Sequence, residues 1–144
     1  MATSFDKIIN SGLTLVDDYK LVKLHNQDIQ RFNGYADGFL IAAIPNFIEC
    51  RNDLTYDADA RQFNADLSQM EISILADLWA LQWFIRETQV NTEISLGINI
   101  NGGVTRHSEA QNLKEKSVHM DKMREKVRQK ITDYQLQDIS AYSF

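Results

Sequence analysis

The stretch that decides the fold runs from Ser68 to Gln89 and reads S-Q-M-E-I-S-I-L-A-D-L-W-A-L-Q-W-F-I-R-E-T-Q. Ser68 followed by Glu71 has the spacing of a capping box, which predicts that a helix begins here. The interior contains no Gly or Pro, and its apolar residues face almost every direction around a helix. A helix that is apolar on all sides is buried on all sides. Because Asp77 and Gln82 interrupt the run, we expect a central core helix rather than a membrane span.

The composition predicts one domain with a substantial core, since 44% of the 144 residues are hydrophobic. Cys50 is the only cysteine, so no disulfide framework is expected, and a buried structural thiol is the favoured interpretation. A lone cysteine fits a reducing compartment. The first residues lack the basic region and apolar run of a signal peptide. We therefore expect synthesis in a cytoplasm.

Shorter helices are predicted ahead of the central one. A turn of helix near the N-terminus is expected to end at Gly12, and Asp17 or Asp18 has the chemistry to cap the next helix. Asn33-Gly34 is a possible break after that, and Pro45 predicts a helix end near Ile44. One apolar face recurs at steps of three and four in this region: Ile29, Phe32, Ala36, Phe39, Leu40, Ala43 and Phe47.

Residues 51–67 are polar and predict a loop, with Phe63 and Leu67 tucked under the central helix. Asp57 and Asp59 match the start of a calcium loop only in spacing, because the glycine and closing glutamate that such a loop needs are missing. We therefore expect no calcium site.

After Gln89 the pattern changes. Ile94, Leu96, Ile98 and Ile100 alternate with polar residues or glycine, which predicts a strand. The sequence Asn101-Gly102-Gly103 indicates a turn, and Val104–Arg106 would return as the second arm of a hairpin. An ordinary surface loop is the equally weighted alternative.

A second long helix is predicted from Ser108 to about Tyr134. Its apolar stripe is thin, so it offers a seam for one partner helix or groove. Residues 106–130 carry eight Lys/Arg and four Asp/Glu, a net charge of +4, which leaves −9 for the rest of a chain whose net charge is −5. This asymmetry indicates either different partners for different surfaces, or self-association of opposite faces, or simply a solvated helix face.

Residues 135–144 form a tail, Q-L-Q-D-I-S-A-Y-S-F, that keeps four spaced apolar side chains. Such a tail predicts a docking peptide that adds as a strand to a partner's sheet; the alternative is that it folds back onto its own domain. The fold class expected is therefore mainly α: a small helical bundle around a buried central helix (domain 1–134), with a β-hairpin or extended loop at 90–107, a long C-terminal helix and a docking tail (135–144).

No catalytic constellation is found. His25, His107 and His119 are isolated, and no phosphate-binding glycine loop is present. Asp77 is the one candidate for a perturbed carboxylate, although an Asp in a core helix more often meets a lysine or a backbone donor. The basic helix lacks aromatic residues, so only nonspecific phosphate contacts are expected. The sequence therefore predicts neither enzyme activity nor a metal or cofactor.

Residues 63–83 read F-N-A-D-L-S-Q-M-E-I-S-I-L-A-D-L-W-A-L-Q-W. This segment resembles F-N-x-D-L-(S/T)-x-x-E-I-x-I-L-A-x-L-M-x-x-x-W of the head–tail connector (adaptor) proteins of tailed bacteriophages. The order of the surrounding elements agrees: F-L-x-x-A-I-P-x-F at 39–47, a charged, cysteine-bearing stretch at 49–53, and H-S-E-A-Q-N-L-K-E-K from His107. The likeness extends over residues 17–134, with Trp79 where the pattern has Met.

The resemblance implies a structural role. Connector proteins of this family form a ring, commonly of twelve copies, beneath the portal of the capsid; they extend the DNA channel and dock the tail or stopper protein. It implies core positions for Leu75, Trp79 and Trp83. Portal contacts would be made by Leu136, Ile139, Tyr142 and Phe144. Subunit contacts would be made by Ile98, Ile100, Val104, Met120 and Val127.

Two other functions stay open. One is a soluble helical interaction module that binds a protein partner through the 108–134 helix and is a monomer or dimer. The other is an enzyme with an unrecognised site around Asp77 or a histidine. Neither requires a membrane.

Overall fold

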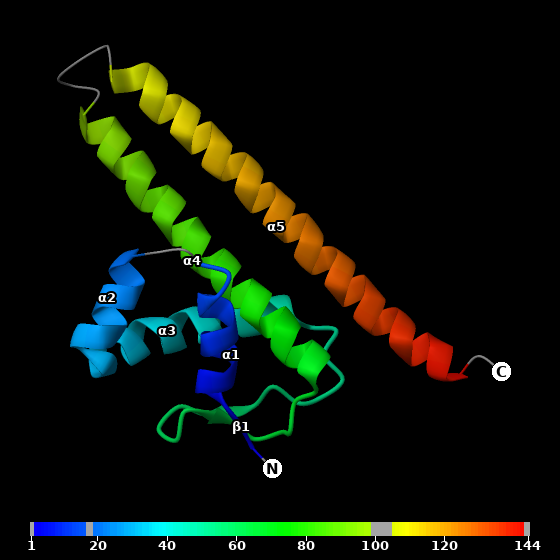
Figure 1. The fold of residues 1–144 in the computed structure, drawn as a ribbon. Helices are drawn as coiled ribbons and strands as arrows, with labels where there is room; N and C mark the ends of the chain where they lie inside the picture. Colours follow the sequence, from blue (N-terminus) through cyan, green and yellow to red (C-terminus); the bar gives the residue numbers. More distant parts are fainter. Residues whose placement is uncertain (1, 17–18, 99–104, 143–144) are drawn as a thin grey trace.

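A computed structural model describes residues 2–16, 19–98 and 105–142, and the side chains of 2–16, 23–86, 114, 115 and 117–137. The described residues are mainly helical, as predicted, with one very small sheet (Figure 1). The elements in chain order are β1 (Thr3–Ser4), α1 (Phe5–Leu13), α2 (Tyr19–Gln27), α3 (Ile29–Ala43), the 3-10 turn η1 (Ile44–Asn46), β2 (Tyr56–Asp57), β3 (Gln62–Phe63), α4 (Gln69–Ile98) and α5 (Thr105–Tyr142).

Helix α4 is the element against which α1, α3 and α5 all pack. The capping box predicted at its start is confirmed, since the Ser68 N–H donates to Glu71 Oε1 at 2.8 Å and the Glu71 N–H donates to Ser68 Oγ at 3.2 Å. Burial on all sides is confirmed for the first half of the helix. Its buried apolar residues are Ile72, Ile74, Leu75, Ala76, Leu78, Trp79, Ala80, Leu81 and Trp83.

Trp79 sits at the centre of the core and is fully buried. Its Nε1–H donates to the Ala36 carbonyl of α3 at 2.9 Å, so the indole is satisfied and fixed in place. On its other side the ring lies against Gly12, where an added Cβ would fall 2.4 Å from Trp79 Cε3. Gly12 therefore lets α1 approach α4 closely. It lies inside the last turn of α1 rather than ending the helix, which corrects the prediction made for it.

The boundaries of α3 come from two local signals. Asp28 caps its start by accepting the N–H of Arg31 at 3.1 Å, and Pro45 ends it as predicted, in the turn η1. Asn33-Gly34 does not break the helix, because tertiary packing of the apolar face outweighs the weak propensity of those two residues. The break lies instead between α2 and α3, at Asp28. The capping role predicted for Asp17 or Asp18 lies outside the described residues.

The segment predicted as a loop contains a small antiparallel sheet of order β1-β3-β2, with Phe63 paired to both Thr3 and Tyr56. Phe63 and Leu67 are buried, as predicted. Thr3 fastens the N-terminus to this segment, since its hydroxyl donates to the Ala65 carbonyl at 3.0 Å and accepts the Leu67 N–H at 2.9 Å. The sheet thus joins the N-terminus of the chain to the 56–63 segment that precedes α4.

The predicted hairpin is wrong in its described parts. Residues 94–98 are the last residues of α4, and 105–107 begin α5. Once a helix is nucleated, each added residue gains a hydrogen bond at little cost, and no Gly or Pro stops α4 before Gly97. The predicted turn at Asn101-Gly102-Gly103, with Ile100 and Val104, lies outside the described residues.

The end predicted for the second long helix, at about Tyr134, is also wrong, because α5 continues to Tyr142. The docking role of residues 135–144 stays a prediction. The segment contains no Gly or Pro, and its apolar residues recur every third residue, which is a helical spacing rather than that of a strand. The long helix is therefore longer than predicted at both ends, at about 57 Å.

Replacing Gly12 by Ala is expected to lower the free energy of unfolding by about 1–3 kcal/mol, because the new methyl group meets a fixed, buried ring. Urea denaturation measures it. The matched control is Gly34→Ala in α3, where nothing lies within 4 Å of the new Cβ. That change should stabilise the fold by up to about 1 kcal/mol through helix propensity. Equal effects at the two glycines would contradict the close approach of α1 and α4.

Candidate functional site: the α4–α5 arm and its groove

Helices α4 and α5 pair antiparallel and form a long arm that extends beyond the base made by α1, α2 and α3 (Figure 1). Two polar contacts hold α5 to the start of α4 and to the 50–52 segment: the Glu71 cluster and the Asp77–Lys130 pair. Their geometry decides which part of the arm is fixed and which part is available to a partner.

Glu71 is buried although it carries a carboxylate. Oε1 accepts the Ser68 N–H and the Asn52 side-chain amide at 2.8 and 2.6 Å. Oε2 accepts the Tyr134 hydroxyl at 2.7 Å and the Cys50 thiol at 3.2 Å. Burial alone would raise the pKa of Glu71, but the hydrogen bonds from Ser68, Tyr134, Cys50 and Asn52 outweigh it and lower the pKa to about 2. The carboxylate is therefore charged at neutral pH and joins α4, the 50–52 segment and α5.

Two partners of Glu71 are held in their protonated forms. Burial, followed by the hydrogen bond to Glu71, raises the pKa of the Cys50 thiol to about 12, so the thiol is a structural donor and a poor nucleophile. Burial also raises the pKa of Tyr134. The Tyr134 oxygen accepts the Arg51 N–H at 2.8 Å, and the Arg51 guanidinium lies 4.1 Å from the centre of the ring. Tyr134 is thus enclosed from every side.

Asp77 meets a lysine, the more frequent of the two roles expected for it. Its Oδ2 lies 2.6 Å from Lys130 Nζ of α5, and the Asp77 side chain is only 6% exposed. Lys130 also donates to Ser73 Oγ at 2.8 Å. A buried carboxylate needs such a counterion, so this pair fixes the register of α5 on α4.

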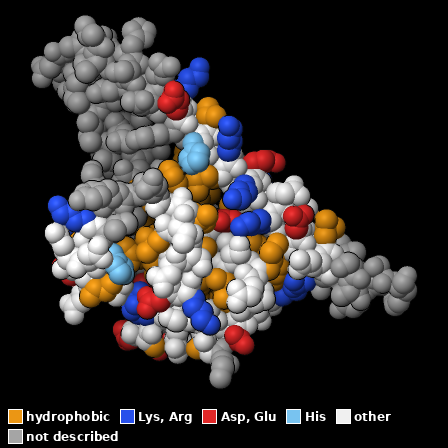
Figure 2. Space-filling model, viewed as in Figure 1, with side chains coloured by type: hydrophobic (Ala, Val, Ile, Leu, Met, Phe, Trp, Pro, Cys, Tyr) orange, Lys and Arg blue, Asp and Glu red, His pale blue; other side chains and the backbone are white. Residues whose placement is uncertain are grey.

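A groove of about 270 Å³ lies beside this pair, between the end of α1 and α5. Leu15, Met123 and Val127 supply apolar surface, while His119, Lys122 and Lys126 line its α5 side. Figure 2 shows hydrophobic surface between α1 and α5 with basic side chains along the α5 side. A second hollow of about 230 Å³ adjoins it, sharing Leu15 and Asp77.

The cationic side of the groove follows from helix geometry. His119, Lys122, Lys126 and Lys130 lie at steps of three and four, so they share one flank of α5. The net positive charge of this helix was predicted, but the gathering of these side chains along one flank was not. The spacing of the lysines indicates this arrangement, whereas nothing in the sequence indicates that Leu15, which follows α1, lies opposite them.

The predicted partner-binding residues are spread over the arm. Leu136 is exposed, at 53%, just past the Glu71 contact. Ile139 and Tyr142 lie in the last turns of α5, and Ile98 ends α4. Met120 is half-buried. Val127 is 4% exposed and packs in the core of its own chain, although a small part of it lines the groove; its role in subunit contacts stays a prediction. Phe144 lies outside the described residues.

Among the described residues, no group of three or more His, Cys, Asp or Glu side chains is arranged to hold a metal ion. Within the same part of the chain, no helix is long and apolar enough to cross a membrane. Comparison with family models, with curated proteins and with solved structures found no match. Inference of function therefore rests on the residues and geometry of this chain.

Acid should weaken the fold through Glu71. Its folded pKa of about 2 lies below the ordinary value of 4.5, so its contribution is complete above pH 4.5 and is lost as the pH falls toward 2. That contribution is about 3 kcal/mol. Urea denaturation of wild type and Glu71→Gln between pH 7 and pH 2 measures it. The variant should show a flatter pH dependence, whereas Glu115→Gln, an exposed control on α5, should keep the wild-type slope.

Removing the charge of Lys130 should be costly. Lys130→Met leaves Asp77 buried without its counterion and is expected to lower the free energy of unfolding by about 3–5 kcal/mol. Asp77→Leu combined with Lys130→Met should regain most of that loss. Lys126→Met, on the exposed part of the same flank, is the control and should change stability by less than about 0.5 kcal/mol. A single Lys130 variant as stable as this control would contradict the pairing.

Proposed function

We propose that this chain is a structural subunit of the neck of a tailed bacteriophage, where copies form a ring that joins the portal of the capsid to the tail and extends the DNA channel. The resemblance of residues 63–83 to head–tail connector proteins supports this class. In that role the protein is made in the host cytoplasm and resides in the virion. It contacts passing DNA only nonspecifically and has no catalytic function.

The observation that carries the proposal is the arm. Its fixed section is short, because the Glu71–Tyr134 and Asp77–Lys130 contacts both lie near the start of α4. Beyond it, α4 and α5 continue past the base, and at the other end α5 runs on past the start of α4 (Figure 1). A chain that forms helices far longer than its own core needs is suited to contacts with other subunits.

The end of α5 is the proposed portal contact. Residues 135–142 add about 12 Å of helix past the Glu71 contact. Leu136, Ile139 and Tyr142 recur every third residue there, and Leu136 is exposed. This pattern supports docking as a helix in a groove of the portal rather than as an added strand. Phe144 continues the same segment.

Contacts between neighbouring subunits are assigned to the far end of the arm and to the middle of α5. Ile98 at the end of α4 and Met120 on α5 stay proposed contacts, as do Ile100 and Val104, which lie outside the described residues. The tail or stopper protein would bind the face of the ring opposite the portal.

A soluble interaction module is the second candidate function. The groove beside α5 supports it, because an apolar floor with basic side chains also suits a single protein partner. That function predicts a monomer or dimer without a capsid, and a chain whose binding survives loss of its C-terminal residues. Imaging of capsid–portal particles mixed with the protein separates the two: a ring at the portal vertex supports the connector, and its absence favours the module.

Deleting residues 138–144 should leave the fold intact, because Tyr134 is the last buried residue described. Attachment to portal-bearing particles should weaken at least about tenfold. Leu136→Asp should have a similar effect, whereas Thr132→Asp, exposed one turn earlier, is the matched control. Cosedimentation with the particles measures binding, and circular dichroism checks the fold. Unchanged attachment of the truncated chain would contradict the portal contact.

A further inference from the structure

The groove between α1 and α5 is lined by lysines for which the described residues supply no ion-pair partner. Lys130 is neutralised by Asp77, but among the described residues no ion pair is seen for Lys122 or Lys126. These two lysines border a floor of Leu15, Met123 and Val127. An apolar floor beside two such cations is complementary to an acidic segment that carries a small apolar side chain between its carboxylates.

The chain presents such a segment in an acidic loop, residues 53–60, which contains β2 and most of the turn that leads to β3. Residues 53–60 read D-L-T-Y-D-A-D-A, with three carboxylates and no basic residue. Residues 55–60 are all exposed. Ala58 stands between Asp57 and Asp59 at the tip, which is the alternation that the groove would accommodate.

The turn at the tip of this loop is already formed by hydrogen bonds, which favours its use in binding. Asp57 Oδ1 accepts the N–H groups of Asp59 and Ala60 at 3.0 and 3.2 Å, closing a tight turn. Arg61 follows with a φ of 54°, and its guanidinium pairs with Asp37 at 2.7 Å and Asp6 at 3.0 Å. Because the turn is already formed, little conformational entropy is lost when the loop docks.

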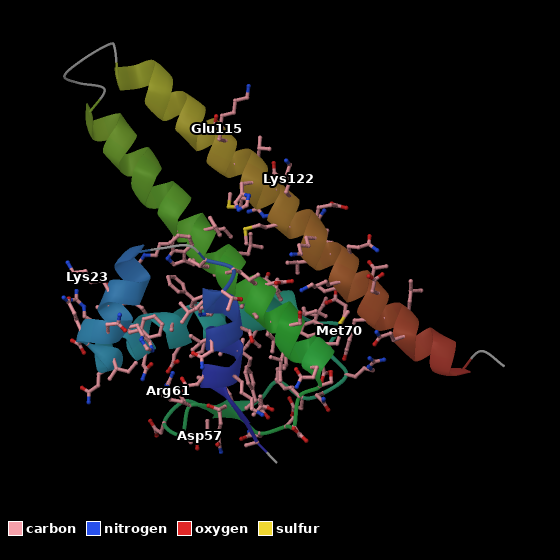
Figure 3. All side chains as sticks on the ribbon, viewed as in Figure 1. Lys23, Asp57, Arg61, Met70, Glu115 and Lys122 are labelled. Atoms are coloured by element: carbon pink, nitrogen blue, oxygen red, sulfur yellow. The ribbon has the colours of Figure 1, made fainter. Side chains whose placement is uncertain are left out.

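The loop of one copy is placed to meet the groove of another. In Figure 3, Asp57 and Arg61 lie at the edge of the base, whereas Lys122 lies on α5 well away from them, so a chain does not fill its own groove. This inference rests on the proposed ring: we propose that the acidic loop (residues 53–60) of a second copy of this chain seats in the groove between α1 and α5. The two surfaces differ, so the contact is head-to-tail and closes into a ring where the rotation permits.

The test is a charge swap in the full chain without any capsid. Lys126→Glu and Asp59→Lys each reverse one side of the contact. Asp59 enters the turn through its backbone N–H, so changing its carboxylate leaves the turn intact. The third variant carries both changes. The control is Arg128→Glu, because two residues along a helix places Arg128 on the far side of α5 from Lys126.

Sedimentation equilibrium at low salt gives the self-association constant, and amide NMR shifts against concentration map the surfaces. Each single reversal should weaken association at least about tenfold, and the swap should return it to within about threefold of wild type. Arg128→Glu should stay within about twofold of wild type. The mapped shifts should fall on residues 53–60 and along the groove.

Several results would overturn the contact. One is the absence of self-association up to about 1 mM protein, and another is an association constant that Arg128→Glu lowers as much as Lys126→Glu does. The contact is also rejected if the double variant does not recover wild-type association, or if the NMR shifts fall only on other surfaces. None of these bears on the ring itself, which is judged by imaging at the portal vertex. A ring there together with a failed swap would reject this contact alone, and a working swap without a ring would reject the connector function alone.

Discussion

The arrangement of the molecule depends on one buried carboxylate. An uncompensated charge in a protein interior is very costly, so Glu71 is stable there only because four donors from three separate segments converge on it. The same residue closes the capping box of α4 and accepts the Tyr134 hydroxyl of α5. If any one donor is lost, the buried Glu71 carboxylate keeps its charge with one hydrogen bond fewer to stabilise it. The residue that caps α4 therefore also joins this helix to the 50–52 segment and to α5.

This constraint divides α5 into parts with different roles. Near Lys130 and Tyr134 it belongs to the core, through Asp77, Glu71 and the Phe47 ring that lies 5.4 Å from the Tyr134 ring. Toward its first residues, α5 leaves the base and runs only beside α4 (Figure 1). After Tyr134, α5 passes the start of α4 with Leu136 exposed. The section of α5 that is packed in the core fixes the direction of the parts before and after it. A fixed direction of this kind suits the assembly role proposed for the chain.

Local signals in the sequence predicted the helices where they were strong. Ser68 and Glu71 marked the start of α4, Pro45 marked the end of α3, and the apolar run predicted burial of Trp79. The failures have physical causes. Alternation at 94–98 predicts a strand, yet these residues lie in α4, because short apolar patterns are ambiguous between strand and helix. The capping box predicts only the hydrogen bonds between Ser68 and Glu71. The other partners of Glu71, which are Cys50, Asn52 and Tyr134, are distant in sequence and had no local signal. Opposition of Leu15 to the lysines of α5 is likewise a product of tertiary packing.

The distribution of charge also limits how copies of this chain can meet. A two-fold dimer through the basic flank of α5 would place Lys122 and Lys126 opposite the same lysines of the other copy. A two-fold dimer through the acidic loop would place Asp57 and Asp59 opposite the same carboxylates of the other copy. Like charges facing each other across an interface are unfavourable, so both isologous pairings are disfavoured. Pairing the acidic loop of one copy with the basic flank of another avoids both like-charge repulsions. Such a contact uses two different surfaces on each copy. Repetition of such a contact produces a ring or a filament and never a closed pair. The uneven charge along the sequence is thus a constraint on symmetry as well as on solubility, and it favours the cyclic assembly proposed for this chain.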